Sequence, residues 1–462
     1  MKKLFVILLA ICCLAGCAKK SVSNELKFEV KTEENGKKIF YLFDDNSEHL
    51  NPDFLVDGEN PSAIASFRDL EEGVYTVFSY HHRGTAAEEN EDLFFNTLFR
   101  SAEIAEIKIL AVGINNAWDW RQAWADYTGK TITADEYYRT ASGETITDEV
   151  RYGDKNRYGE MGEVVVIDGG EALLTDILPE IAKSGMNEIR HGCYQEPIWL
   201  MMQFEVVSGT IDFDTIAYKN ETAARNNFDN MSIGKFYDEP QYKGIAENSA
   251  DVYAELGYEI EDETVGNLPV KVFNQKYPNG ISVDTFATNV NTWKREEVTT
   301  AESAESDLME LVYDDGDEVY YFNPFYSKNG EKMADLEPSD DDEFYRNNVL
   351  NLGNFGVTYH YTIDVKNSSS MKKIFEFKMN SNTGQVYRFH FYDKNGNEVK
   401  GTEDFLTKRF DDCPKDGTEA EKYSTSEYFH LEAGESYKIE VEITTLTGCN
   451  APMEISFAIQ ND

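Results

Sequence analysis

The chain has 462 residues, with 85 Asp and Glu against 43 Lys and Arg and a formal net charge of −42. This length predicts two or three domains of about 100–200 residues each, large enough to bury a core. Nucleic-acid binding depends on neutralising phosphates with Lys and Arg, so the charge excludes nucleic acid as an expected partner. It also argues against a polybasic contact with a membrane surface, and we interpret it as keeping the protein soluble.

The first seventeen residues form a targeting segment. A short positive stretch, Met1–Lys3, precedes an apolar run, Leu4–Leu14, that suits a signal peptide and is too short to span a bilayer. The run ends in Leu14-Ala15-Gly16-Cys17, which resembles the lipobox of bacterial lipoproteins, where the Cys is acylated. The resemblance covers these residues only. It implies a signal peptide over residues 1–16, a lipid on Cys17 and attachment to the extracytoplasmic face of a bacterial membrane. The alternative is an ordinary secretory signal with a chance Cys.

Three further cysteines follow Cys17 along the chain. Export permits disulfides, and Cys413 and Cys449 both lie near the C-terminus, so we predict that they form a bridge. Cys193 is then left over and is predicted to be a buried hydrophobic residue. Its neighbour His191 leaves open the alternative of a Cys/His nucleophile.

Turn chemistry recurs along the chain and predicts antiparallel β structure. After a lipidated tether over residues 17–25, Asn35-Gly36 separates two short β-type runs, which is a strong hairpin signal. The same dipeptide recurs at residues 279–280, 329–330 and 395–396. Strands do not alternate with helices, so a doubly wound sheet is not expected. We predict a mainly β protein with two antiparallel β-sandwich (jelly-roll-like) domains and a few short helices.

The N-terminal sandwich is predicted over residues 26–220. Its strand candidates are 74–82, 106–112, 163–167, 198–207 and 210–218, of which 163–167 and 198–207 are apolar enough to be central. The apolar residues within Phe94–Phe99 recur at helical spacing and predict a short helix. Ala117–Thr128 also predicts a helix, ended by Gly129.

The composition shifts to Asn, Asp, Glu and Tyr over residues 221–265, which we expect to be a linker with one short helix at Ala250–Leu256. Residues 266–462 are predicted to form the C-terminal sandwich. Its strand candidates are 269–273, 281–290, 308–313, 318–325, 357–365, 374–379, 386–392, 428–431, 437–443 and 453–459.

Few residues point to catalysis or metal binding. Phosphate loops, zinc-ligand spacings and nucleophile elbows are missing from the sequence. His81 and His82 point to opposite faces of one strand and are expected to be ordinary histidines, like His360 and His390. Residues 314–318 and 393–397 are oxygen-rich and would suit Ca²⁺, but a polar turn and a hairpin turn are the favoured interpretations. The sequence identifies no cofactor.

Aromatic and polar residues interleave at residues 118–124. Trp faces stack on sugar rings, and Asp119 and Arg121 can hydrogen-bond hydroxyl groups. Trp120 and Trp124 share one helix face, so we expect both to pack onto the sheet. Trp118 at the helix start is then the exposed one. We therefore predict a ligand site at Trp118, Asp119 and Arg121.

The segment Gly209–Ile216 resembles the closing strand of jelly-roll carbohydrate-binding modules. Together with the lipobox, it favours a lipid-anchored protein that binds an extracellular ligand, a glycan or a surface protein, without catalysis. Two alternatives stay open. One is a hydrolase of cell-surface or extracellular polysaccharide, whose catalytic pair cannot be picked out among 85 acids. The other is a structural or adhesive surface protein.

Overall fold

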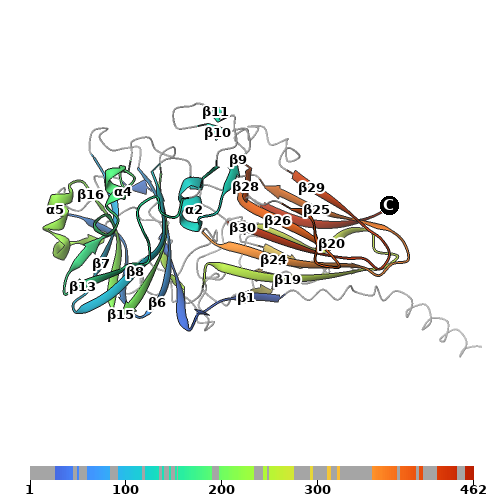
Figure 1. Cartoon of the computed structure of the whole chain (residues 1–462), viewed down its shortest axis with the longest axis horizontal. Coiled ribbons are helices and arrows are strands. Elements are labelled where there is room, and N and C mark those ends of the chain that lie inside the picture. The colour runs from blue at the N-terminus through green and yellow to red at the C-terminus, as the bar shows by residue number, and fades with distance from the viewer. Residues whose placement is uncertain are drawn as a thin grey trace, which may run out of the picture.

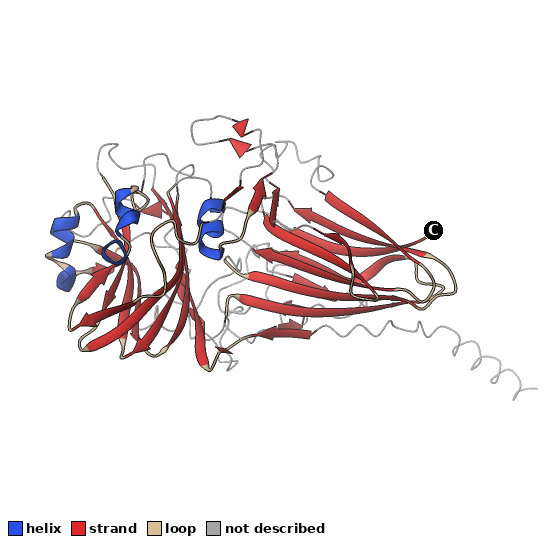
Figure 2. Ribbon diagram, viewed as in Figure 1, coloured by secondary structure: helices blue, strands red, loops and turns tan. Residues whose placement is uncertain are grey.

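The computed structural model describes residues 27–44, 49–50, 60–83, 92–116, 120–134, 138–139, 145–146, 151–152, 154–189, 197–233, 243–246, 249–274, 292–294, 310–313, 320–322, 356–381, 385–401, 405–408, 424–444 and 453–462. Over these residues the protein is mainly β with a few short helices, which confirms the predicted fold class. Figure 1 shows two β-sandwiches, and Figure 2 shows how few helices accompany them. None of the described helices has the length and apolarity needed to cross a membrane.

The N-terminal sandwich stacks two sheets. The first, which we name the shared sheet, has the order β13-β8-β15-β6-β3-β18, and the second, the outer sheet, has the order β14-β7-β16-β5-β17. Most pairs are antiparallel, but β3 and β4 pair parallel to β6, and β17 pairs parallel to β5. The strands of the shared sheet are β13 (Val164–Asp168), β8 (Ile104–Asn115), β15 (Ile198–Ser208), β6 (Gly73–Arg83), β3 (Lys37–Asp44), β18 (Lys243–Ala246) and the attached β2 (Glu33–Glu34) and β4 (His49–Leu50). Those of the outer sheet are β14 (Glu171–Leu173), β7 (Phe94–Arg100), β16 (Ile211–Tyr218), β5 (Ser62–Leu70) and β17 (Ser232–Ile233).

The central strands of the shared sheet are buried on both faces. In β6, Tyr75 and Val77 face the interior of the N-terminal sandwich, whereas Phe78 and Tyr80 join a second cluster with the C-terminal strands. A strand covered on both faces is apolar at successive positions instead of alternating positions. The two sandwiches are therefore held together by one continuous set of apolar contacts.

Short helices cover the far face of the outer sheet. Leu98, Ile216 and Tyr218 of this face pack against Ala224 and Phe228. The helical elements at this end of the sandwich are α3 (Leu174–Ile177), α4 (Pro179–Lys183), α5 (Glu221–Arg225) and the 3₁₀ turn η2 (Phe228–Asn230).

The short helix predicted at Phe94–Phe99 was wrong, because these residues lie in β7. Phe95 and Phe99 face the sandwich interior, and Leu98 faces the covering helices. Because β7 is covered on both faces, it needs apolar residues on both. The resulting spacing of apolar residues resembles that of an amphipathic helix.

The C-terminal sandwich also stacks two sheets. One of them, which we name the open sheet, has the order β1-β19-β24-β30-β26-β28-β9-β12, with β27 beside β26. The other, the back sheet, has the order β21-β23-β22-β20-β31-β25-β29. The open sheet comprises β1 (Lys27–Val30), β19 (Asp251–Ile260), β24 (Thr358–Asn367), β30 (Ser436–Thr444), β26 (Gln385–Asp393), β28 (Phe405–Lys408), β9 (Ile132–Ala134), β12 (Arg151–Tyr152) and β27 (Glu398–Gly401). The back sheet comprises β21 (Thr292–Lys294), β23 (Tyr320–Phe322), β22 (Glu310–Tyr313), β20 (Gly266–Asn274), β31 (Met453–Asn461), β25 (Lys373–Ser381) and β29 (Ser424–Leu431). A separate hairpin pairs β10 (Tyr138–Arg139) with β11 (Thr145–Ile146).

Aromatic rings from both sheets fill this second core. The ring centroids of Phe377 in the back sheet and Phe391 in the open sheet are 6.0 Å apart. Their ring planes meet edge to face at 80°. Phe391 also stacks on Phe429, with ring centroids 3.9 Å apart. Each such ring contributes roughly 1.5–3 kcal/mol by leaving water.

The helix predicted at Ala250–Leu256 was also wrong, because β19 occupies these residues and pairs with β1 and β24. Residues 221–265, which we expected to be a linker, carry α5, η2, β17, β18 and β19. Residues 27–30 and 132–134, expected in the N-terminal domain, pair with strands of the open sheet. The domain limits drawn from the sequence stay a prediction.

The helix predicted at Ala117–Thr128 is confirmed as α2 (Trp120–Thr128), followed by Gly129 at a φ of +66°. It packs against β8 so closely that a Cβ on Gly113 would lie 1.7 Å from the carbonyl oxygen of Ala123. Trp124 is 1% exposed within the cluster that joins the two sandwiches. The helix therefore occupies the junction between them.

Candidate functional site

One face of the open sheet carries polar side chains. In β24, Tyr359, Tyr361 and Ile363 are buried in the core, whereas His360 and Asp364 lie on the opposite face. The same alternation in β30 and β26 puts further charged side chains on this face. Because strand register is known, the polar face can be described as rows of residues that run across the strands.

The row nearest the N-terminal sandwich is occupied by ion pairs. Lys130 and Arg388 both bind the Glu442 carboxylate, at 2.5 and 2.8 Å. His360 Nε2 lies 2.8 Å from Asp251 Oδ1, and its ring stacks on Tyr253 with centroids 4.6 Å apart. These contacts connect the segment after α2 to the open sheet.

A small pocket of about 110 Å³ lies beside this row, at the junction. Its walls include Trp124 and Tyr127 of α2 and the two acids Asp251 and Glu442. Paired carboxylates suit glycoside hydrolysis when they flank the scissile bond. Here both acids are already bound by the cationic or imidazole groups described above, so this pocket does not provide an unoccupied catalytic pair.

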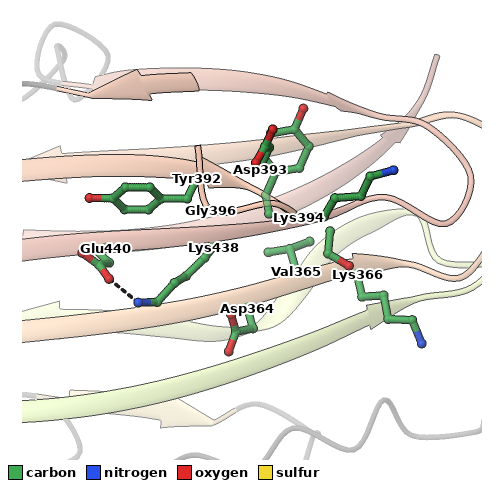
Figure 3. A pocket seen from close by; sticks show the side chains of 11 residues that line it. Asp364, Val365, Lys366, Tyr392, Asp393, Lys394, Gly396, Lys438 and Glu440 are labelled. Atoms are coloured by element: carbon green, nitrogen blue, oxygen red, sulfur yellow. Dashed lines mark hydrogen bonds and ion pairs between the residues drawn. The ribbon is translucent and has the colours of Figure 1, made fainter. Parts of the chain in front are cut away.

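A larger hollow of about 650 Å³ lies further along the same face (Figure 3). Register places Asp364 of β24 opposite Lys438 of β30, and Lys438 opposite Tyr392 of β26. Lys438 forms an ion pair with Glu440, two residues along the same strand. Among the described residues, no hydrogen bond or ion pair holds the Asp364 carboxylate. The hollow therefore combines an aromatic ring, an acid and a base within one row.

Gly257 extends the open space beside this row. It pairs with Asp364 in the parallel β19–β24 ladder, and a Cβ built on it would meet no atom within 4 Å. Glycine inside a strand weakens the strand and often marks a site where a ligand or another backbone approaches closely. A glycine at position 257 is therefore better explained by the approach of a ligand to the sheet than by close packing against a neighbouring side chain.

The surroundings of Tyr392 disfavour ionisation of its hydroxyl group. Burial first, and then the carboxylates of Glu440 and Glu398, raise the pKa of Tyr392 above its ordinary value. The hydrogen bond to Glu440 is the main cause that raises the pKa of Lys438. The hollow therefore presents hydroxyl and ammonium donors beside the carboxyl groups of Asp364 and Glu440.

The turn at residues 393–397 closes one end of the hollow. Asp393 accepts hydrogen bonds from the backbone amides of Asn395 and Asn397, at 2.8 and 2.9 Å. Gly396 has a φ of +78° and donates to the Asp393 carbonyl. The predicted hairpin turn is confirmed, because the oxygens of Asp393 bind the amides of the turn.

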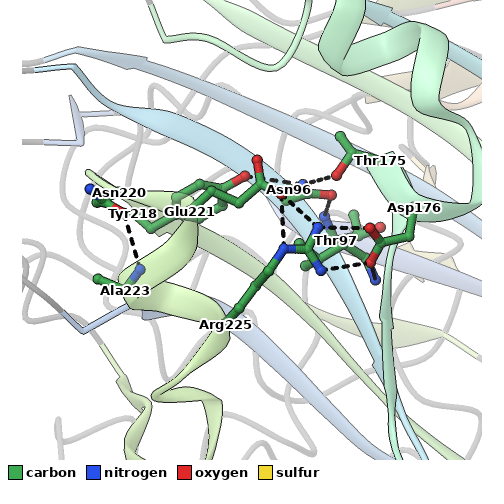
Figure 4. Close-up of polar contacts among 10 residues, drawn as sticks. Asn96, Thr97, Thr175, Asp176, Tyr218, Asn220, Glu221, Ala223 and Arg225 are labelled. Carbon is green, nitrogen blue, oxygen red and sulfur yellow. Dashed lines mark hydrogen bonds and ion pairs between the residues drawn. The ribbon is translucent and has the colours of Figure 1, made fainter.

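A second polar cluster lies where α3 and α5 meet the outer sheet (Figure 4). Asn96 donates to Thr175 and Tyr218, at 2.8 and 3.2 Å, and all three are buried. Arg225 forms a two-bond ion pair with Asp176, at 2.7 and 2.9 Å. These groups satisfy one another, so the cluster fastens the helices to the sheet.

Most residues nominated from the sequence lie outside the described residues: Cys17, Trp118, Asp119, Cys193, Cys413 and Cys449. Arg121 lies in the first turn of α2, where its backbone alone is described. Trp124 is in the core, as expected from the helix face that it shares with Trp120. His81 is fully buried beside Ser79 and Asp44. In the part of the chain that the structure describes, no three His, Cys, Asp or Glu residues gather as metal ligands would.

Sequence reasoning missed the hollow on the open sheet. The polar alternation of residues 358–366 was visible, but every half-exposed strand shows such alternation. Only register brings Asp364, Lys438 and Tyr392 together, from positions far apart in the chain.

No protein-family model matches the chain, and no curated protein matches it. Among solved structures, one match is the crystal structure of the coconut allergen cocosin, at 10% sequence identity. The match covers 90% of this chain and 86% of that one, with a TM-score of 0.10. A TM-score this low gives no support for a shared fold or a shared function.

Proposed function

We propose that the protein is a bacterial lipoprotein, held at the extracytoplasmic side of a membrane through Cys17, that binds an extracellular glycan without catalysis. The lipobox-like end of the apolar N-terminal run supports the anchor. Acyl chains on Cys17 would give stable attachment, since each buried CH₂ contributes about 0.8 kcal/mol. The sequence after the tether would then be presented outside the cytoplasm.

The observation that carries the binding proposal is the row of Asp364, Lys438 and Tyr392 along the hollow. Figure 3 shows the Tyr392 ring lying beside the strands, next to the Lys438–Glu440 pair. Sugars need an apolar ring face for stacking and both donors and acceptors for their hydroxyl groups. The hollow offers all three in a space of about 650 Å³.

The anchor is tested by mass spectrometry of the mature N-terminus. We expect acylated Cys17 as the first residue, and no lipid on a Cys17→Ser form. An unmodified N-terminus at another residue would remove the basis for attachment.

The ligand site is tested on the unlipidated mature chain, residues 17–462 with Cys17→Ser. A glycan array identifies a ligand, and calorimetry then compares three variants. We expect Tyr392→Ala to weaken binding by about 1–3 kcal/mol, as for other aromatic stacking platforms. Tyr428→Ala is the matched control, because Tyr428 is 52% exposed on β29 of the back sheet.

Trp118→Ala is the third variant, because the sequence nominates Trp118 as an alternative platform. Loss of affinity in Trp118→Ala alone would move the site to the start of α2. Equal affinity of Tyr392→Ala and wild type for every glycan hit would contradict a site on the open sheet.

A further inference from the structure

The edge strand β13 is apolar and exposed to an unusual degree. We predicted Glu163–Ile167 to be a central strand, but the structure places β13 at the end of the shared sheet, which corrects that prediction (Figure 1). Val164 and Val166 are 48% and 56% exposed, and the neighbouring Ile104 is 63% exposed. Edge strands normally carry charges or Pro that discourage pairing. In β13 the charged Asp168 stands only at the end of the strand, and two exposed valines, with Ile104 of β8 beside them, form an apolar patch.

The backbone of β13 has hydrogen-bonding groups that point away from the sheet. Gly169 donates to the carbonyl of Glu103 at 3.2 Å, and this pair continues the β13–β8 register. Hydrogen-bonded pairs alternate along an antiparallel ladder. The N–H and C=O groups of Val164, Val166 and Asp168 therefore face outward, and no described strand lies beyond them.

The same residues also direct their side chains to one face. Register places Val164 opposite Lys108 and Val166 opposite Glu106, with Ile104 diagonal to Val166. An added strand would thus gain main-chain hydrogen bonds and apolar contacts together, which are the two sources of affinity in strand addition.

The charge around β13 defines its partner. Asp168 lies in β13 and Glu163 directly precedes it, while Glu106 and Lys108 of β8 lie opposite Val166 and Val164, so acids outnumber bases by three to one at this edge. A second copy of the chain would bring two such acidic segments together, in a protein of net charge −42. A basic partner would instead be attracted.

We propose that β13 is a docking edge for an extended, Lys- or Arg-flanked aliphatic segment of another protein, which adds as a strand next to Val164–Asp168. This contact uses a different sandwich from the proposed glycan site. Either one can therefore fail without the other.

The probe is a synthetic peptide of alternating valine and threonine with two lysines at each end, titrated into the unlipidated mature chain. We expect binding that Val166→Lys weakens by about tenfold or more, which corresponds to 1.4 kcal/mol. Val399→Lys is the control, because Val399 is 50% exposed on β27 of the other sandwich. A peptide that is N-methylated at alternate residues and one with glutamate flanks should both bind more weakly.

Hydrogen exchange supplies an independent readout. On peptide binding, the amides of Val164, Val166 and Asp168 should gain protection, whereas those of Val165 and Ile167 already bond to β8. No peptide binding, equal loss in Val166→Lys and Val399→Lys, or unchanged exchange at the three amides would overturn the proposal. Dimerisation without peptide that Val166→Lys abolishes would overturn it in favour of a second copy.

Discussion

The shared sheet and the open sheet contrast in what covers them. The shared sheet is buried on both faces along β3, β6 and β15, by its own sandwich and by the C-terminal strands. The open sheet is buried on one face and carries ion pairs, polar groups and a hollow on the other. The shared sheet joins the sandwiches, and the open sheet presents side chains to solvent.

The difference determines where side chains can change at little cost in stability. A doubly buried sheet admits few changes, because each side chain on either face is packed. A sheet with one open face tolerates changes there, since surface substitutions usually alter stability by less than about 0.5 kcal/mol. Variants at the junction and on the open face therefore test this contrast.

Truncation of Trp124 should have the largest effect on stability. The side chain is 1% exposed between α2, the shared sheet and the open sheet, so Trp124→Ala should leave a cavity and cost about 3–5 kcal/mol. Urea unfolding of the unlipidated chain measures this cost. Tyr428→Ala, which truncates an exposed ring, is the control and should stay close to wild type. A cost for Trp124→Ala as small as that expected for Tyr428→Ala would mean that the junction contributes little to stability.

Two glycine substitutions should distinguish the two sheets by their effect on stability, which we expect to be smaller than that of Trp124→Ala. Gly113→Ala places a methyl group 1.7 Å from the Ala123 carbonyl oxygen and should destabilise the protein by about 1–3 kcal/mol or more. Gly257→Ala meets open space and should be neutral or stabilising by up to about 1 kcal/mol. Unfolding curves under identical conditions compare them. Equal destabilisation would contradict the assignment of open space beside Gly257.

The smallest expected effect is the pH dependence of the Asp176–Arg225 pair at the far end of the N-terminal sandwich. Burial opposes ionisation, but the hydrogen bonds from Arg225 and from the Leu173 amide outweigh it and lower the pKa of Asp176. A lowered carboxyl pKa stabilises the fold above the unfolded value of about 3.9, and this stabilisation is lost as pH falls through the folded pKa.

Arg225→Gln should therefore be less stable than wild type at pH 7, and the difference should shrink as the pH falls below about 4. Urea midpoints between pH 7 and pH 3 measure it. Lys183→Gln, which removes an exposed ion pair with Glu180, is the control and should change little at any pH. A constant difference between Arg225→Gln and wild type across this range would assign the effect to packing.

Local patterns in the sequence predicted much of the secondary structure. Asn35-Gly36 makes the hairpin turn between β2 and β3, with φ values of 53° and 78°. The strands predicted within 357–392 and 428–459 are confirmed. A strand that has one face in the core and the other in solvent shows alternating apolar and polar residues, and this pattern can be recognised in the sequence. Gly129 ends α2 as predicted, because glycine adopts the left-handed conformation at little cost.

The sequence by itself therefore determined the β class, the hairpin turns and the position of α2, all of which depend on neighbouring residues. The tertiary structure decided which faces are covered, and with them the strand nature of β7, the edge position of β13 and the pairing of β19 with β24. It also decided the candidate site, because Asp364, Tyr392 and Lys438 become neighbours only through strand register. Register joins residues that are distant in the chain, and no local pattern of side chains encodes which distant strand will be the partner.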